Sequence, residues 1–193
     1  EEGDPARFSG QWLEAREPAD HAARSRALTD TLANWLTVEY NTKAAGKPAG
    51  DPLHLVDIGS GRGSNPGYLI PRLPVPQRWT LIEPDQHLLG LACHRVEALD
   101  APAVPLMREL TPHNLDELLP DDAALVTASA LIDLVSEHWL RAFSSAVVRR
   151  RAGVLVVISY SGHFDLAPSH ASDALVQELV NQHQHGDKGS GAA

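Results

Sequence analysis

The sequence has 193 residues, of which 43% are hydrophobic and 21% charged, as in a globular domain with a sizeable core. Its 25 acidic and 16 basic residues give a net charge of -9, which argues against a protein that binds the nucleic-acid backbone. The single cysteine, Cys93, cannot form an intrachain disulfide. No run is apolar enough to span a membrane, and the acidic N-terminus does not resemble a signal peptide. We therefore expect a cytoplasmic protein without membrane contact.

The N-terminal segment predicts two helices. The first is expected over residues 8–16 and is ended by Pro18, whereas the second runs over residues 20–40 with Asp20 as its cap. Its apolar residues recur at helical spacing and predict one buried stripe, formed by Leu28, Leu32, Trp35 and Leu36. Residues 41–52 are polar and rich in Gly, Pro and Ala, which is typical of a linker.

A glycine-rich turn follows the first expected strand, residues 53–58. The turn has three glycines at alternate positions, Gly59, Gly61 and Gly63. An acid, Asp57, lies two residues before the first of them. Asn65 and Pro66 then indicate the start of a helix, because Asn can cap free amides and Pro fits the first turn. Strand, turn and helix N-terminus together bring backbone N–H groups up to a ligand.

The glycine spacing distinguishes between ligands. A dinucleotide fingerprint needs a glycine at position 64, where this chain has Ser64. The pattern instead resembles motif I of the class I S-adenosylmethionine (SAM)-dependent methyltransferases and matches it at every defined position. The resemblance implies that the turn passes under the methionine part of SAM and that Asp57 orients the loop and the amino group of the cofactor. We place Ser60 and Asn65 in the same cofactor site.

The N-terminal helices fit this resemblance. Methyltransferases of this class often carry helices before motif I that cover the cofactor. The Arg-Glu-Pro-x-Asp run that begins at Arg16 resembles the opening of a group of bacterial members. Arg16 or Arg24 could therefore reach the carboxylate of SAM, since a guanidinium pairs well with one. The alternative, that both are solvated helix arginines, stays open.

The second expected strand ends in an acid, Glu83, 26 residues after Asp57. This is close to the spacing of a carboxylate that accepts two hydrogen bonds from a ribose diol in a βαβ unit. The position resembles motif II of the methyltransferases, and we include the adjacent Pro84 in the cofactor site. Asp85 is the better cap for the next helix, residues 86–99.

The third expected strand, residues 103–110, contains Pro105, which favours an edge position. In the family, residues just after this strand flank the adenine. Glu109 and Leu110 occupy that place here, with Glu where many members have Asp. A short helix is expected over residues 111–119.

The fourth strand begins near residue 122 and ends in small residues. The end of this strand resembles motif IV, where the family places the acceptor and the departing methyl group. We assign Thr127, Ala128 and Ser129 to the cofactor site, with Ser129 also near the acceptor. A helix capped by Ser136 is expected to end at Gly153.

Three residues are candidates for catalysis near the acceptor. They are Asp133, His138 and Tyr160, and each has an ordinary structural alternative as a cap or loop residue. Tyr160 follows the fifth strand, whose five consecutive aliphatic residues predict burial on both faces. A last helix is expected over residues 169–184. We reject a metal site at His183 and His185, since the spacing is not that of a zinc helix.

The alternation of strands and helices predicts an α/β fold with a doubly wound, mostly parallel sheet. The family order is 3-2-1-4-5, followed by a hairpin of strands 6 and 7. Nothing after Tyr160 is typical of that hairpin, so we expect either that the sequence is cut short before it or that strand 5 is an open edge. A second subunit, in a homodimer, or the missing residues would cover such an edge. The expected parts are a helical cap (1–45), a SAM-binding core (53–165) and a C-terminal helix with a flexible tail (166–193).

These observations predict a SAM-dependent methyltransferase with S-adenosylhomocysteine (SAH) as product and no metal. The acidic charge favours a small-molecule acceptor and disfavours nucleic acid. Two alternatives stay open. One is a SAM-binding protein without catalysis, which the missing hairpin favours. The other is an NAD(P)-dependent oxidoreductase, which shares the βαβ unit and Glu83 but has a different glycine spacing.

Overall fold

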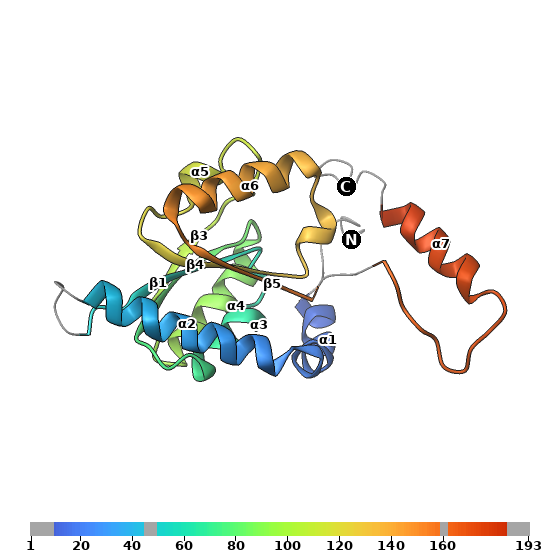
Figure 1. Ribbon diagram of the computed structural model, residues 1–193, viewed down its shortest axis with the longest axis horizontal. Coiled ribbons are helices and arrows are strands. Elements are labelled where there is room, and N and C mark those ends of the chain that lie inside the picture. Colours follow the sequence, from blue (N-terminus) through green and yellow to red (C-terminus); the bar gives the residue numbers. More distant parts are fainter. Residues whose placement is uncertain (1–9, 45–49, 159–161, 185–193) are drawn as a thin grey trace.

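The computed structural model describes residues 10–44, 50–158 and 162–184. Five parallel strands form one sheet in the order β3-β2-β1-β4-β5, with helices on both faces (Figure 1). The strands are β1 (Leu53–Ile58), β2 (Gln77–Ile82), β3 (Ala103–Leu106), β4 (Ala123–Ser129) and β5 (Gly153–Val157). The helices are α1 (Gly10–Ala23), α2 (Arg26–Ala44), α3 (Ser64–Leu69), η1 (Ile70–Arg72), α4 (Gln86–Glu97), α5 (Leu115–Leu118), η2 (Ile132–Leu134), α6 (Glu137–Arg150) and α7 (Asp173–Gln184). The predicted fold class and strand order are confirmed.

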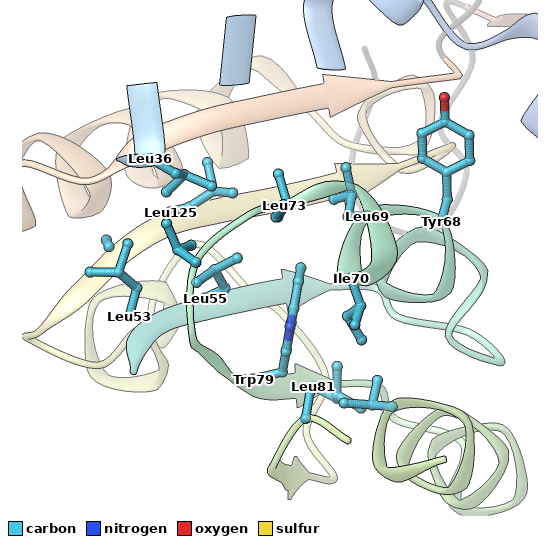
Figure 2. Packing of buried hydrophobic residues seen from close by; sticks show 14 of the residues in the cluster. Leu36, Leu53, Leu55, Tyr68, Leu69, Ile70, Leu73, Trp79, Leu81 and Leu125 are labelled. Carbon is cyan, nitrogen blue, oxygen red and sulfur yellow. The ribbon is translucent and has the colours of Figure 1, made fainter. Parts of the chain in front are cut away.

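Two apolar clusters hold the helices against the sheet. On one face, α2, α3, η1 and α4 pack on the central strands, and Leu36, Leu55 and Trp79 belong to one buried cluster there (Figure 2). On the other face, the stacked rings of Trp139 and Phe143 of α6 lie 5.4 Å apart within the second cluster. All six residues of β1 are buried, as expected for the central strand of a covered parallel sheet.

The N-terminal helices differ from the prediction. α1 continues through Pro18 to Ala23, so Pro18 does not end it. The helix tolerates the missing N–H because its side chains contact the body of the protein, as described below. α2 begins only at Arg26, and the Ser25 hydroxyl accepts a hydrogen bond from the Leu28 N–H at 3.3 Å. Asp20 lies inside α1 and is not a cap.

The apolar stripe of α2 is shifted from its predicted position. Leu32 and Leu36 are buried and Trp35 packs against them, but Leu28 is 59% exposed. The α2 helix reaches the start of β5, where a Cβ on Gly153 would lie 2.6 Å from the Trp35 ring. Gly153 therefore provides room for this ring and does not end α6, whose C-cap is Arg151 in the left-handed conformation.

Other helices and strands also begin or end at residues different from those predicted. β3 stops at Leu106, so the adenine candidates follow the strand in a loop, and α5 is only four residues long. β3 lies at the sheet edge, as Pro105 predicted. The third glycine of the turn, Gly63, is the N-cap of α3, so the prediction that Asn65 caps this helix is wrong.

β5 is the opposite edge of the sheet and pairs only with β4 among the described residues. Val154 is 47% exposed, so the prediction that β5 is buried on both faces is wrong. An aliphatic run signals a covered strand, but a sheet edge lacks the neighbour that would cover it. Past β5, residues 162–184 contain α7, which lies apart from the sheet and exposes Leu175 and Leu179 (Figure 1).

Within the described residues, no helix is long and apolar enough to span a membrane.

Candidate cofactor site

The glycine turn has a backbone that side chains disfavour. The φ angles of Gly59, Gly61 and Gly63 are +63°, +51° and +76°. A Cβ on Gly63 would lie 2.9 Å from the Cα of Ala92, so the third glycine also allows α3 to pack closely on α4. The turn therefore requires glycine for two reasons, backbone conformation and close helix packing.

Asp57 lies below this turn and is 1% exposed. Its Oδ1 accepts hydrogen bonds from the Asn65 amide and from the Thr127 hydroxyl, both at 2.6 Å. The Ser60 hydroxyl donates to the Asp57 carbonyl at 2.8 Å. Burial raises the pKa of Asp57 to about 6, against the lowering effect of these hydrogen bonds. The carboxyl group thus joins β1, β4 and α3 beneath the turn.

Arg24, between α1 and α2, is connected to Asp57 through Asn65. Its Nη1 donates to the Asn65 carbonyl oxygen at 2.8 Å, and its guanidinium lies 4.3 Å from the centre of the Tyr68 ring. Since Arg only donates and the other Asn65 contact is a carboxylate, the amide orientation is fixed. Arg24 is 9% exposed, yet its Nη2 has no hydrogen-bond partner among the described residues. Arg24 is therefore a buried cation with one donor unpaired within this part of the chain, which is costly to leave without a partner.

The structure separates the two candidate arginines. Arg16 pairs with Asp20 on its own helix at 2.7 Å, and its guanidinium lies 4.7 Å from the Trp12 ring centre. Only Arg24 joins the Asp57 network. Burial lowers the pKa of Arg24, while Tyr68 and Asp57 act to raise it.

Glu83 directly follows β2, whose last residue lies beside the end of β1. The carboxylate of Glu83 accepts from the Gly61 N–H at 2.9 Å and from the Asp85 N–H at 3.1 Å. Burial raises the pKa of Glu83, and the two backbone N–H groups act to lower it. Pro84 is exposed beside it, and Asp85 caps α4 as predicted. Two acids of the sequence motifs are thus held at adjoining strand ends.

The remaining cofactor candidates lie in the loop after β3 and in the last part of β4. Glu109 is exposed and Leu110 half-buried, and the Leu110 carbonyl accepts from the Trp139 ring N–H at 3.0 Å. Thr127 and Ala128 are buried in β4, whereas Ser129 is half-buried at its end. The hydroxyl of Thr127 points to Asp57.

The contacts that the structure describes assign a role less clearly to the three catalytic candidates than to the cofactor candidates. Asp133 is half-buried in η2, and His138 is exposed in the first turn of α6, where its ring lies 6.3 Å from that of His113. Tyr160 lies outside the described residues. Among the described residues, no three His, Cys, Asp or Glu side chains form a group that could hold a metal ion.

Sequence reasoning missed the face of α1 that contacts the turn. Leu13 packs over Gly61, Glu17 pairs with Arg95, and His21 lies 3.0 Å from the Ser64 hydroxyl. Leu13, Glu17 and His21 recur every four residues, which would indicate one helix face. A helix that ended at Pro18 would not include His21, so the predicted helix shows no such face.

Solved structures share the fold of this chain. The carbon methyltransferase DszA superimposes with a TM-score of 0.54 at 10% identity, covering 76% of this chain and 39% of DszA. A SAM-dependent methyltransferase from Clostridium acetobutylicum gives 0.48 at 13% identity, covering 75% of this chain and 52% of that one. A putative SAM-dependent methyltransferase from Methanococcus maripaludis gives 0.47 at 12% identity, with coverages of 81% and 66%.

The chain therefore has the Rossmann-like fold of the class I SAM-dependent methyltransferases. It spans about half the length of the Clostridium methyltransferase and less of DszA. No protein-family model and no curated protein matches the sequence.

Proposed function

We propose that the protein binds SAM at the glycine turn and transfers its methyl group to a small-molecule acceptor. The observation that carries this proposal is the pairing of Glu83 with the Gly61 N–H at 2.9 Å. This contact holds a carboxylate beside a turn of three left-handed glycines, at the strand ends where ligands bind in open α/β sheets.

The residues present fit the cofactor at both ends. Each Glu83 oxygen uses one acceptor site on a backbone N–H, which leaves others for a ribose diol. Arg24 offers its unpartnered Nη2 to the carboxylate of the methionine part. Desolvation makes this donor costly while it is unpaired, so a bound carboxylate stabilises it.

SAM supplies an activated methyl group when bound, so the protein has mainly to position the acceptor. A general base is required only when the acceptor is a protonated amine or a hydroxyl. Asp133, His138 and Tyr160 stay predictions for that role, and the net charge of -9 favours an acceptor other than nucleic acid.

The test is calorimetric titration with SAH and, separately, with NADH. We expect SAH to bind and NADH not to bind. Arg24→Gln should weaken SAH binding by about tenfold or more, the loss expected for one charge-assisted pair. Arg16→Gln is the matched control, since this arginine pairs within α1, and its affinity should equal that of the wild type. Binding of NADH without SAH would contradict the proposal.

A methylation assay with labelled SAM over a panel of small acceptors distinguishes catalysis from binding alone. Transfer to any acceptor supports the enzyme. SAH binding without transfer across the panel would favour the second candidate, a SAM-binding protein, for which the exposed edge of β5 is the supporting observation.

A further inference from the structure

The α1 helix lies against the glycine turn through several contacts. Arg62 donates to the Gly10 carbonyl at 3.0 Å and pairs with Glu14 at 2.8 Å. Leu13 lies next to Gly61. Glu14 is 70% exposed, so its pair with Arg62 contributes little.

The strongest contact of α1 comes from outside the turn. Arg95 of α4 donates to both oxygens of Glu17, Nη1 at 2.8 Å and Nη2 at 2.7 Å. The Glu17 side chain is 16% exposed and that of Arg95 32%. A two-point pair in this setting fixes the position and rotation of a helix better than a single surface contact.

Arg95 reaches Glu17 by crossing α3 at Gly67. A Cβ on Gly67 would lie 2.8 Å from Cδ of Arg95, 3.3 Å from Nε and 3.5 Å from Cγ. Gly67 does not need glycine for a positive φ angle. What it provides is the space through which the arginine passes.

We propose that Arg95 is a positioning residue of the cofactor site, which crosses α3 at Gly67 and, through Glu17, holds α1 on the glycine turn. This inference rests on the proposed function, because the site it supports is the SAM site. The α1 helix ends at Ala23, one residue before Arg24, so its docking also determines where Arg24 enters the Asp57 network.

The test uses Gly67→Ala, Arg95→Ala and the double variant. Alanine is favoured over glycine within a helix, so any loss in Gly67→Ala comes from displacing the arginine. Each single variant should speed amide hydrogen exchange in α1 and raise the SAH dissociation constant about three- to tenfold, as the docked fraction falls. The double variant should equal Arg95→Ala, since without the arginine the methyl group at position 67 displaces nothing.

Gly90→Ala is the matched control, because a Cβ there has no neighbour within 4 Å, and it should behave as the wild type. Additive losses in the double variant, or unchanged exchange in α1, would overturn the inference. Faster exchange with an unchanged SAH dissociation constant would show that Arg95 docks α1 without positioning the site, and would also overturn it. If the wild type binds no SAH, the proposed function fails and the positioning role fails with it, while the exchange data still report whether Arg95 holds α1.

Discussion

Asp57 shows how a single buried group can both hold the turn and set a pH dependence. Its carboxyl group is fully enclosed, and burial raises its pKa from 3.8 to about 6. The folded state therefore binds the proton more tightly than the unfolded chain. The sign follows from linkage: this stabilisation is present at low pH and is lost as the pH rises through about 6.

We therefore expect Asp57→Asn to change the pH profile of stability. The amide keeps an oxygen that can accept from Thr127 and Asn65 but removes the titration. Relative to this variant, the wild type should lose up to about 3 kcal/mol of unfolding free energy between pH 4 and 7.5. Urea denaturation at both pH values measures the difference. Parallel profiles for the two proteins would contradict the raised pKa.

Position 63 cannot accommodate a side chain without strain, for two independent reasons. Its φ of +76° is strained for alanine, and the added Cβ would lie 2.9 Å from the backbone of Ala92. Gly63→Ala should lower the unfolding free energy by about 2 kcal/mol or more, measured by chemical denaturation. Gly90→Ala, which adds the same methyl group in open space, should not; equal losses in both would refute the packing argument.

At the scale of elements, His54 connects three parts of the sheet at the end opposite to the site. Its Nε2 lies 2.8 Å from the Thr80 hydroxyl of β2, and its Nδ1 lies 2.7 Å from Asp122, just before β4. The Asp122 carboxylate also pairs with Arg78 of β2. This network connects the starts of β1, β2 and β4 with polar contacts inside an apolar sheet.

His54→Ala should therefore reduce the unfolding free energy by about 2–4 kcal/mol, since it leaves a cavity and an unpaired Thr80 hydroxyl. Burial lowers the pKa of His54, although Asp122 acts to raise it. Wild-type stability from this group is thus present above about pH 6.5 and lost as the pH falls toward the folded pKa. The variant should lack that loss. His113→Ala, at an exposed histidine, is the control, and a similar cost there would count against the network.

The order of the helices and strands along the chain was predictable because hydrophobic patterns and turn signals are local. The residues at which helices and strands end were less predictable. Pro18 is a strong local signal for a helix end, yet α1 continues through it because its side chains contact residues far along the chain. One such contact is the pair of Glu17 with Arg95, 78 residues away. Such a contact has no trace near Pro18 in the sequence.

At the scale of the whole molecule, the parallel sheet with helices on its two faces follows from the alternation of strands and helices and from right-handed crossovers. The order of the strands was expected from the resemblance to the methyltransferases, and the structure has that order. The hydrophobic pattern does not show which strands are covered on both sides by other parts of the protein. The aliphatic run of β5 predicts a covered strand, but β5 stands at an edge with Val154 exposed. Burial depends on neighbours as well as on the residues themselves.

The sequence by itself determined the glycine turn, the acids Asp57 and Glu83 and the alternation of strands and helices, because a φ angle, a strand end and a crossover are set within one βαβ unit. Only the tertiary structure decided between Arg16 and Arg24. The two arginines lie eight residues apart and have the same chemistry. Because α1 ends at Ala23, Arg24 lies buried in the core, whereas Arg16 pairs with Asp20 on its own helix. Such a choice depends on the packing of α1 and α2 on the sheet, which local sequence does not encode.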